Sequence, residues 1–391
     1  MPSNTVKVDT VIAGGGIAGL WLLNVLRSKG YSAVLLEAER LGGGQTLSSQ
    51  GIVHGGMKYA LGGALTPASE ALSQAPGRWR ACLRGTGEVN LRGLEPLCDR
   101  FHLFAGGGAL GRLAAFFASK ALHGRVELLD RHDHPEALRD DAFRGPVYRL
   151  EDFVLDTSAL VERLATLGSG NIYRHSMTAD ACTLDGDVQV RLADCNLSAN
   201  RLILAAGAGN EALIEGLGVS SIAMQRRPLH QVVARHPHLL PLYGHWLAGA
   251  GRAEPRLTIT THRDGGESAR SGLLWHLGGQ LATDGVCSSA EDQRNQARLE
   301  LETCFPWMDW SLATFETWRI DRAEPCQPAG LRPDHAFAEA SGPCIVCWPT
   351  KLTLAPDLGD RVLGLLPPPE HPSPGPLTLQ PAAVGRTPWG A

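Results

Sequence analysis

Three glycines near the start of the chain have the spacing of a phosphate-binding turn. Gly14, Gly16 and Gly19 directly follow the apolar residues 8–13. The first glycine allows a tight turn, the second lets the backbone approach a pyrophosphate, and the third lets a helix pack closely on a strand. Glu37 comes 18 residues after Gly19 and can accept hydrogen bonds from ribose hydroxyls. The spacing therefore predicts a dinucleotide site.

The elements that must position these residues lie in the same stretch. Residues 8–13 read as a buried parallel strand, and residues 17–28 have the apolar spacing of a helix that Gly30 can end. A second strand is predicted at residues 33–37, with Glu37 at its end. The helix N-terminus supplies free N–H groups and a partial positive charge for phosphates. The stretch is therefore a strand–helix–strand unit with the site at the first turn.

Composition restricts the class of protein. The 391 residues predict two or three domains, and a hydrophobic content of 43% provides a large core. A net charge of -4 gives no basic surface for nucleic acid. Since no secretory leader and no run of 18 apolar residues is found, we expect a cytoplasmic protein without a transmembrane segment. Peripheral contact with a membrane stays open.

The cysteines do not form a disulfide or metal pattern. There are nine, an odd number, scattered along the chain. Cys344 and Cys347 have CxxC spacing, but they lie in an apolar segment that reads as a buried strand, and no second pair at zinc spacing accompanies them. Packing in the core is favoured over redox or metal chemistry, and no metal site is predicted.

The segment after Glu37, ERLGGGQTLSSQGIVHGG at residues 39–56, is polar and rich in glycine. It resembles the flavoprotein family of D-amino-acid oxidase, glycine and sarcosine oxidases, 2-hydroxyglutarate dehydrogenase and flavin-linked glycerol-3-phosphate dehydrogenase. In that family the segment follows the pyrophosphate and ribitol of FAD to the isoalloxazine ring. The resemblance extends to about residue 366, and it implies FAD as the cofactor in place of NAD.

Three further segments resemble the hydroxyl-oxidising members of this family. They are HGGMKY at 54–59, AGLRP at 329–333 and TKLTL at 350–354. Before the lysine of the last segment, Trp348 and Pro349 replace the glycine pair that is usual in the family. The residues LTLAP at 352–356 resemble the helix start of the amine-oxidising members instead. The substrate therefore cannot be taken from either branch.

The resemblance implies an α/β fold with a Rossmann-like FAD-binding domain and a second α+β substrate domain on a mostly antiparallel sheet. The expected ranges are 1–75, 146–217 and 316–366 for a discontinuous FAD-binding domain, 76–145 and 218–315 for the substrate-binding domain, and 367–391 for a disordered proline-rich tail.

Several elements are predicted locally within these ranges. Asp156 is expected to cap a helix within residues 150–168. A hairpin is expected to turn at Asp185-Gly186, and residues 224–235 resemble the strand that follows the FAD domain in this family. Residues 290–306 have the spacing of an amphipathic helix that covers a sheet.

The cofactor-binding residues expected from the pattern and the resemblance come from the glycine turn, the end of the second strand, the polar loop, and three later segments. They are Gly14, Gly16, Ile17, Ala18, Gly19, Glu37, Ala38, Arg40, Thr46, Ser48, Ser49, Gly51, Met177, Ala206, Gly207, Thr350, Lys351 and Leu352.

The candidate catalytic residues are three, and each has a plainer alternative. Arg332 can bind a substrate carboxylate or phosphate through two parallel hydrogen bonds, with Arg319 and Arg322 as second candidates; a surface role is the alternative. Lys351 can place a positive charge at the flavin pyrimidine edge or on the substrate, or can be a solvated loop lysine.

His54 is the third candidate. It can act as a base or donor near the substrate, can tether the flavin covalently as a loop histidine does in dimethylglycine-type relatives, or can brace the loop. Tyr59 can line the pocket or pack as a structural aromatic residue.

The function expected from these features is oxidation of a C–H bond next to a hydroxyl on a small anionic substrate, a 2-hydroxy acid or a polyol phosphate, by hydride transfer to FAD. An amino-acid or secondary-amine oxidase is the first alternative, and a flavin-binding scaffold without turnover is the second. A dehydrogenase that uses NAD is a further alternative; it predicts a colourless protein, which would rule out a bound flavin. The electron acceptor, whether oxygen, quinone or another protein, is left open.

Overall fold

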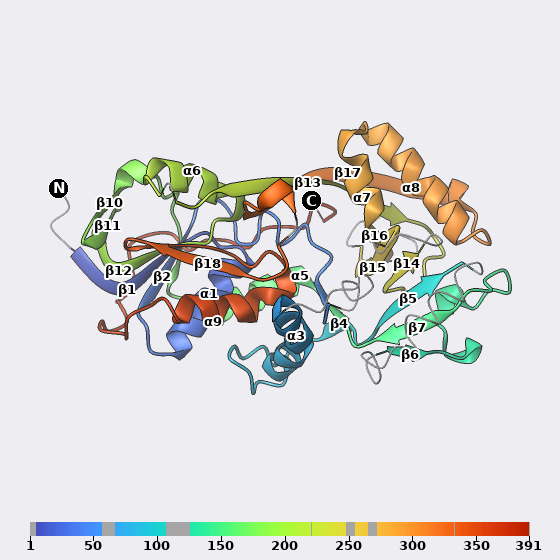
Figure 1. Ribbon diagram of the computed structural model, residues 1–391, viewed down its shortest axis with the longest axis horizontal. Coiled ribbons are helices and arrows are strands. Elements are labelled where there is room, and N and C mark those ends of the chain that lie inside the picture. Colours follow the sequence, from blue (N-terminus) through green and yellow to red (C-terminus); the bar gives the residue numbers. More distant parts are fainter. Residues whose placement is uncertain are drawn as a thin grey trace.

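The computed structural model contains two large sheets and one small sheet. Figure 1 shows the sheet nearer the N-terminus at one end of the long axis and the second large sheet at the other, with β13 and β17 bridging them. The structure describes residues 5–56, 67–106, 126–219, 221–247, 255–264, 272–331 and 333–390.

The first sheet has eight strands and is built around a parallel core. Five strands run parallel and are neighbours in the order β9, β2, β1, β12 and β19, whereas β10, β11 and β18 are antiparallel additions. The bounds are β1 (Thr5–Ala13), β2 (Ala33–Glu37), β9 (Ile172–Arg174), β10 (Cys182–Asp185), β11 (Asp187–Arg191), β12 (Asn196–Leu204), β18 (Phe337–Ser341) and β19 (Cys344–Trp348).

Alternate residues of the parallel strands serve two different cores. Ile12 and Ile345 belong to the cluster formed with the helices α1, α3, α5 and α9, whereas Val11 belongs to the cluster on the opposite face, next to α6. This division follows from the two-residue period of a strand. The helices are α1 (Ile17–Ser28), α3 (Pro67–Leu83), α5 (Thr157–Leu167), α6 (Asn210–Gly216) and α9 (Ala355–Leu363).

The same period explains the CxxC pair. Cys344 and Cys347 both lie in β19, but their side chains join opposite core clusters because the two cysteines are three positions apart along a strand, which is an odd number. Both thiols are free and buried, and burial raises the pKa of Cys347 to about 12. The interpretation as core packing is therefore confirmed.

The second large sheet is antiparallel except where β14 lies parallel to β5. The helices α7 (Gln280–Asp284) and α8 (Ala290–Cys304) contact its strand β13, and α8 also contacts β17. In spatial order the strands are β17 (Thr314–Pro325), β13 (Met224–Arg235), β16 (Leu273–Gly278), β15 (Leu257–Arg263), β14 (Gly244–Leu247), β5 (Phe101–Ala105), β7 (Val147–Leu150) and β6 (Val126–Leu128). The expectation of a mostly antiparallel second sheet is confirmed.

The small sheet lies between the two large ones in the order β3 (Ile52–Val53), β8 (Phe153–Leu155) and β4 (Pro96–Cys98). Two expected domain boundaries fall inside elements: residue 75 lies within α3, and residue 316 lies within β17 of the second sheet. The division into two domains stays a prediction. Boundaries at residues 75 and 316 would cut α3 and β17, so any domain boundary must lie outside these two elements.

Most local predictions agree with the elements. The helix at 17–28 and the strand at 224–235 have the predicted bounds, and Gly186 turns the β10–β11 hairpin with a φ of 78°. Asp156 caps α5, since its Oδ1 accepts from the N–H groups of Ser158 at 2.8 Å and Ala159 at 3.1 Å.

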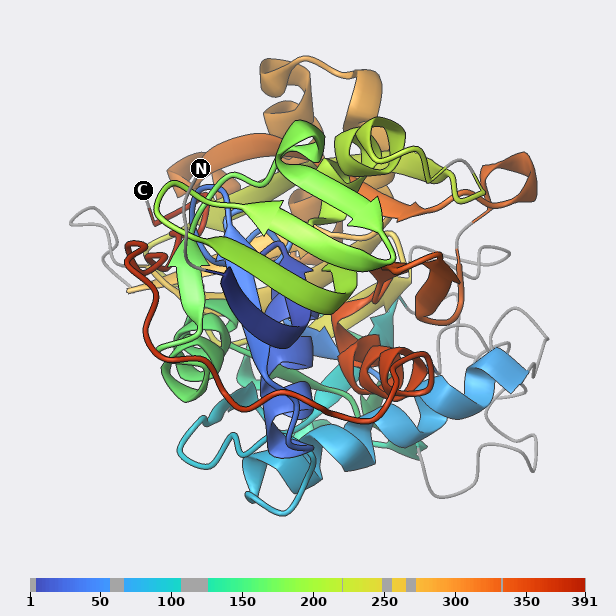
Figure 2. The same cartoon turned by 90° about the vertical axis from the view of Figure 1, so that its left-hand side faces the viewer.

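The expectation of a disordered tail is wrong for residues 367–390. The Leu41 N–H donates to the Ala383 carbonyl, and the Gly385 N–H donates to the Leu41 carbonyl, both at 2.9 Å. Trp389 is only 8% exposed. Figure 2 shows this segment, in dark red, running from α9 along the first sheet toward the C-terminus. An extended segment that pairs through backbone groups carries no periodicity, so composition alone did not reveal its packing.

Within the described ranges, no helix combines the length and the apolar character that crossing a bilayer requires.

Candidate cofactor-binding and active site

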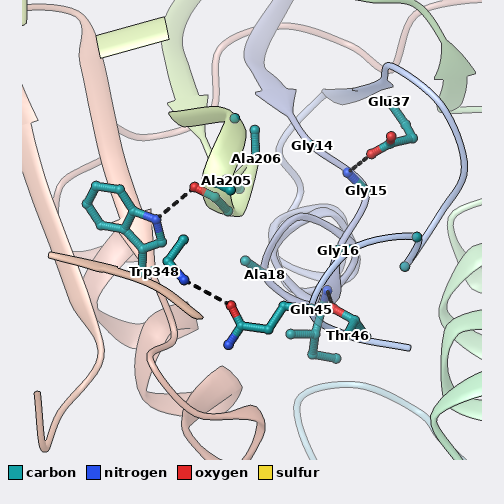
Figure 3. Close-up of a pocket in the computed structure, with 18 of the residues that line it drawn as sticks. Gly14, Gly15, Gly16, Ala18, Glu37, Gln45, Thr46, Ala205, Ala206 and Trp348 are labelled. Atoms are coloured by element: carbon teal, nitrogen blue, oxygen red, sulfur yellow. Dashed lines mark hydrogen bonds between the residues drawn. The ribbon is translucent and has the colours of Figure 1, made fainter. Parts of the chain in front are cut away.

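A cavity of about 720 Å³ lies at the carboxyl ends of the parallel strands of the first sheet. Residues directly after β1, β2, β9, β12 and β19 line it. Five strands at the usual spacing of ~4.8 Å span ~19 Å, so the cavity suits an extended ligand. This edge is where open parallel sheets bind their ligands. Figure 3 shows the glycine turn between Glu37 on one side and Trp348 on the other.

The glycine turn is fixed by close backbone contacts. Gly14 has a φ of +106°, and a Cβ there would lie 2.5 Å from the Cα of Ala206. A Cβ on Gly19 would lie 1.9 Å from the carbonyl oxygen of Gly14. Any side chain at either position would displace backbone, so these residues keep α1 close to β1 and leave the turn open to a ligand.

The acidic residue at the end of β2 is held by backbone groups. Its Oε2 accepts from the Gly15 N–H at 2.6 Å, as Figure 3 shows, and its Oε1 accepts from the Glu39 N–H at 2.9 Å. Both carboxylate oxygens of Glu37 are therefore oriented at the edge of the cavity. A carboxylate in this position is the group that recognises a ribose in dinucleotide sites.

The polar loop after β2 supports the start of α1. Gly16 is the N-cap residue of α1 and has no side chain that could cap the helix. Thr46 supplies the missing acceptor, because its Oγ1 accepts from the Ile17 N–H at 3.0 Å. The Ser49 hydroxyl donates to the Thr46 carbonyl at 2.9 Å. The loop thus forms one wall of the cavity and helps to satisfy the helix N-terminus.

The far end of the cavity is built by the residues after β19. The Trp348 indole N–H donates to the Gly207 carbonyl at 3.1 Å (Figure 3). Thr350 has a φ of 59°, which is rare for a β-branched residue, and its hydroxyl donates to the His335 carbonyl at 2.9 Å. Such backbone strain is concentrated at functional sites.

Lys351 follows this strained residue and lines the cavity. It is 7% exposed, and its Nζ donates to the Pro333 carbonyl at 2.6 Å. This bond brings the TKLTL segment against the AGLRP segment, as the order of the two sequence patterns suggested.

The structure brings together most of the expected cofactor residues. Those that line the cavity are Gly14, Gly16, Ile17, Ala18, Glu37, Ala38, Arg40, Thr46, Ser49, Met177, Ala206, Gly207, Thr350, Lys351 and Leu352.

Three expected cofactor residues are not among the lining residues. Gly19 acts through packing, and Ser48 is buried. Gly51 has a φ of +70°, and a Cβ there would lie 2.0 Å from the Leu155 carbonyl oxygen. The small sheet therefore requires glycine at position 51, whatever the cofactor.

Among the described residues, Lys351 is the one expected catalytic residue that lines the cavity. His54 is buried, and it is not among the lining residues. Its N–H donates to the Thr353 hydroxyl at 3.2 Å, and that hydroxyl donates back to the His54 carbonyl at 3.0 Å. Arg332 and Tyr59 lie outside the described residues.

Arg319 and Arg322, the second candidates for binding the substrate anion, both donate hydrogen bonds to backbone carbonyls. Arg319 lines the cavity and donates to the carbonyls of Val286 and Ser288. Arg322 does not line the cavity, and its Nε donates to the Arg227 carbonyl at 3.4 Å.

Of the wall that β17 contributes, sequence reasoning named only Arg319. Ile320, Asp321 and Ala323 line the cavity although they belong to the second sheet. The Gln45 Oε1 accepts from the Ala323 N–H at 3.2 Å, which joins the polar loop to this strand (Figure 3). The glycine run before Gln45 was a signal for the loop, but no local pattern shows that Ile320, Asp321 and Ala323 lie beside it.

The loop also reaches the interior of the second sheet. The Gln50 amide donates to the carbonyls of Thr258 and His276, both at 2.9 Å. Burial lowers the pKa of His262 to about 4 and that of His276 well below its usual value. Both imidazoles are therefore neutral at pH 7, on the sheet that the loop touches.

Comparison with known proteins defines the class. The chain matches the family described as FAD dependent oxidoreductase (DAO) over residues 9–344. A probable FAD-dependent oxidoreductase of Pseudomonas aeruginosa is 48% identical over 372 residues, which cover 92% of this chain and 91% of that protein. The protein is an enzyme that uses FAD, and it belongs to the FAD-dependent oxidoreductase (DAO) family.

Solved structures share the fold. The crystal structure of the Pseudomonas aeruginosa oxidoreductase superposes with a TM-score of 0.82 and 39% identity, over 100% of this chain and 99% of that one. Glycine oxidase from Geobacillus kaustophilus gives 0.64 and 15%, over 93% and 96% of the two chains. An FAD-bound L-alpha-glycerophosphate oxidase from Mycoplasma pneumoniae gives 0.65 and 12%, over 97% and 98%. The last two matches show the mixed α/β fold alone.

The described residues fit FAD. The glycine turn leaves backbone N–H groups at the start of α1, a held carboxylate lies at one end, and a buried ammonium lies at the wall. These are the groups that a dinucleotide with an anionic pyrophosphate requires.

Proposed function

We propose that this cavity holds FAD in an extended form across the strand ends. Glu37 accepts hydrogen bonds from the ribose hydroxyls, the turn at Gly14 and Gly16 binds the pyrophosphate, and the backbone near Met177 contacts the adenine. The segment from Trp348 to Leu352 takes the isoalloxazine end. The single observation that supports this most is the cavity itself, because it runs from the glycine turn to Lys351 without leaving the strand ends.

Bound FAD supplies the two-electron acceptor, and the protein supplies position and charge. The Lys351 Nζ donates to the Pro333 carbonyl, and this bond holds the ammonium at the cavity wall. Burial in a site of low dielectric strengthens the attraction of such a charge for an anion. Lys351 therefore stabilises negative charge that develops at this end during the reaction.

We propose that the substrate is a small anion oxidised at a C–H bond next to a hydroxyl, a 2-hydroxy acid or a polyol phosphate. The support is the pairing of Lys351 with Pro333, because it joins the two segments that carry the predicted cations Lys351 and Arg332. In this proposal Arg332 binds the carboxylate or phosphate through its guanidinium.

Oxidation of an amino acid or a secondary amine is the second candidate. One observation favours it: Leu352–Leu354 forms a single turn that leads directly into α9, with Pro356 near the helix start, which is the helix start typical of the amine-oxidising branch by resemblance. The two candidates differ in the atom bonded to the reacting carbon, which is a hydroxyl oxygen in the first and an amine nitrogen in the second.

The test is anaerobic reduction of the purified enzyme by a panel of donors, followed at the flavin absorption bands. Reduction by glycerol 3-phosphate or 2-hydroxyglutarate supports the first candidate, and reduction by glycine or sarcosine supports the second. If dithionite reduces the enzyme and none of several anionic donors does, the protein is a flavin-binding scaffold. Peroxide formed in air identifies oxygen as the electron acceptor.

The role of Lys351 is tested with Lys351→Met. The variant should keep its FAD but be reduced by the active donor at least about 10-fold more slowly, which corresponds to about 1.4 kcal/mol of lost transition-state stabilisation. Lys29→Met is the control, because Lys29 is exposed at the end of α1. Equal rates for the two variants would overturn this role.

A further inference from the structure

One face of β17 carries Ile320, which lines the cavity, and, further along the strand, a group of aromatic rings that do not themselves line the cavity. Ile320 lines the cavity, and Trp318, two residues earlier on β17, lies on the same face of the sheet. Trp318 pairs with Gln231 on β13, and Val233 on β13 pairs with His276 on β16. The rings of Trp318 and His276 are 5.1 Å apart. The face beyond the cavity is therefore polar and aromatic.

Trp389, near the C-terminus, covers these rings. Its indole centroid lies 4.9 Å from that of His276, 5.2 Å from that of His262 and 5.5 Å from that of Trp318. The Trp389 carbonyl accepts from an Arg235 Nη2 at 3.2 Å, which fixes the backbone at this point. We call the group of His262, His276, Trp318 and Trp389 the ring cluster.

The ring cluster contains polar atoms that the described protein leaves unsatisfied. The Nδ1 of His276 and the Nε1 of Trp318 are buried and have no hydrogen-bond partner among the described residues, and His276 is 0% exposed. Buried polar groups normally have partners, and those without one mark places where a ligand or water binds. The second ring nitrogen of His276 is bonded to the Gln231 side chain, which orients the imidazole.

The segment that carries Trp389 also touches the cofactor loop. Leu41 exchanges backbone hydrogen bonds with Ala383 and Gly385 at 2.9 Å, and Leu41 lies beside Gly42 and Gly43 of the cavity wall. The position of Trp389 is therefore tied to the loop that the cofactor occupies. On the other side, the Gln50 amide ties the same loop to the His276 carbonyl.

We propose that Trp389 is a specificity-determining residue: its indole, which covers the rings of His262, His276 and Trp318, closes the end of a substrate space that extends from the FAD cavity, and it excludes substrates with bulky substituents. The inference rests on the function proposed above. It predicts that the wild-type enzyme takes compact anions and that removal of the indole opens the His262 and His276 face to a ring of similar size.

Two experiments on the FAD-loaded, full-length protein test this role. The first measures how fast diethyl pyrocarbonate modifies His262 and His276, by mass spectrometry of the peptides. Trp389→Ala should react at least tenfold faster than wild type, whereas Trp389→Phe, which keeps a ring, should react like wild type. Gln380→Ala is the control, because Gln380 is an exposed residue of the same segment. Equal reactivity in all four proteins would overturn the wall.

The second experiment titrates acetate and benzoate while the flavin absorption is followed. Trp389→Ala should gain at least tenfold in affinity for benzoate relative to acetate, and Trp389→Phe should gain less. An unchanged ratio would overturn the specificity role. If neither anion alters the spectrum of any variant, the anionic substrate proposed above is contradicted, and the labelling experiment still decides whether Trp389 covers the histidines.

Discussion

The cofactor end, which consists of the glycine turn, Glu37 and the polar loop, is linked to the ring cluster through the Gln50 amide, yet the two regions are built in opposite ways. The cofactor end uses glycines, backbone N–H groups and one carboxylate, from residues close together in the chain: the turn at Gly14 and the loop at Thr46. The ring cluster uses large side chains from three strands and a residue near the C-terminus. Under the proposals above, the first region recognises a constant cofactor through the backbone, and the second limits the shape of the substrate through side chains.

This difference predicts how each region tolerates change. A backbone-built site fails when any side chain intrudes, because backbone cannot move aside cheaply. A side-chain wall changes its shape and its selectivity when one ring is lost. The predictions below separate these two behaviours, beginning with the largest effect.

Gly19→Ala should abolish FAD binding, with affinity reduced at least about 100-fold. Alanine normally stabilises a helix by up to about 1 kcal/mol relative to glycine, but here its Cβ would lie 1.9 Å from the Gly14 carbonyl oxygen. The measurement is flavin content and FAD affinity of the purified variant. Gly77→Ala is the matched control, since Gly77 is an exposed helical glycine of α3 with open space around its would-be Cβ. Normal FAD binding by Gly19→Ala would refute a backbone-built site.

Stability should fall as the pH is lowered through the range of His262. Burial lowers the pKa of His262 from 6.5 to about 4. Between pH 6.5 and pH 4, His262 is therefore protonated in the unfolded chain but not in the folded protein. The stabilisation is complete above pH 6.5 and is lost on the way to pH 4, by up to about 3 kcal/mol. Unfolding by urea at several pH values measures it.

Two variants check that this pH dependence comes from the ring cluster. His262→Gln should make the pH dependence less steep, because glutamine does not titrate; the part due to His276, whose pKa burial also lowers, should remain. His132→Gln should leave it unchanged, because the His132 side chain is 77% exposed. A flat wild-type curve would contradict a buried neutral imidazole.

Glu37→Gln should weaken FAD binding about 10-fold without altering the ring cluster. The variant keeps the shape but loses the charge that strengthens the hydrogen bonds, which is worth about 1.5 kcal/mol. Isothermal titration of the apoprotein with FAD measures the loss. Glu302→Gln, an exposed position on α8, serves as control. Unchanged affinity would exclude Glu37 from cofactor recognition.

Asp156→Ala should have the smallest effect, a loss of about 1 kcal/mol in unfolding free energy with FAD affinity unchanged. Its carboxylate caps α5 and does not line the cavity. Asp156→Asn should retain stability, because asparagine caps a helix equally well. A drop in FAD affinity for Asp156→Ala alone would mean that the helix layer, and not only the turn, sets the cofactor site.

Much of the cofactor end was predictable from the sequence because its signals are local. Glycine spacing, the helix at 17–28 and the strand that ends at Glu37 appear within forty residues, and each has a direct physical meaning. The same reasoning assigned Gly51 to the cofactor, although its conformation is required by the backbone of Leu155. A glycine shows that space is needed, but not which neighbour needs it.

The ring cluster was not predictable, because long-range pairing creates it. His262, His276 and Trp318 meet only after the four strands β17, β13, β16 and β15 pair, and Trp389 joins them from a proline-rich segment without periodicity. His54, which stood out in the sequence, is instead held against Thr353. Around the ring cluster, the residues that local sequence patterns single out are therefore not the residues that the fold brings together.

Non-covalent binding of FAD by the described cavity is tested most directly by absorption spectra of the purified protein before and after acid precipitation. Flavin bands in the native protein and a yellow supernatant are the predicted result, since His54 is buried and is not among the residues that line the cavity. Colour that stays in the precipitate would contradict a non-covalent cofactor and would point to a tether. A colourless protein that does not take up added FAD would contradict the assignment of the cavity to FAD.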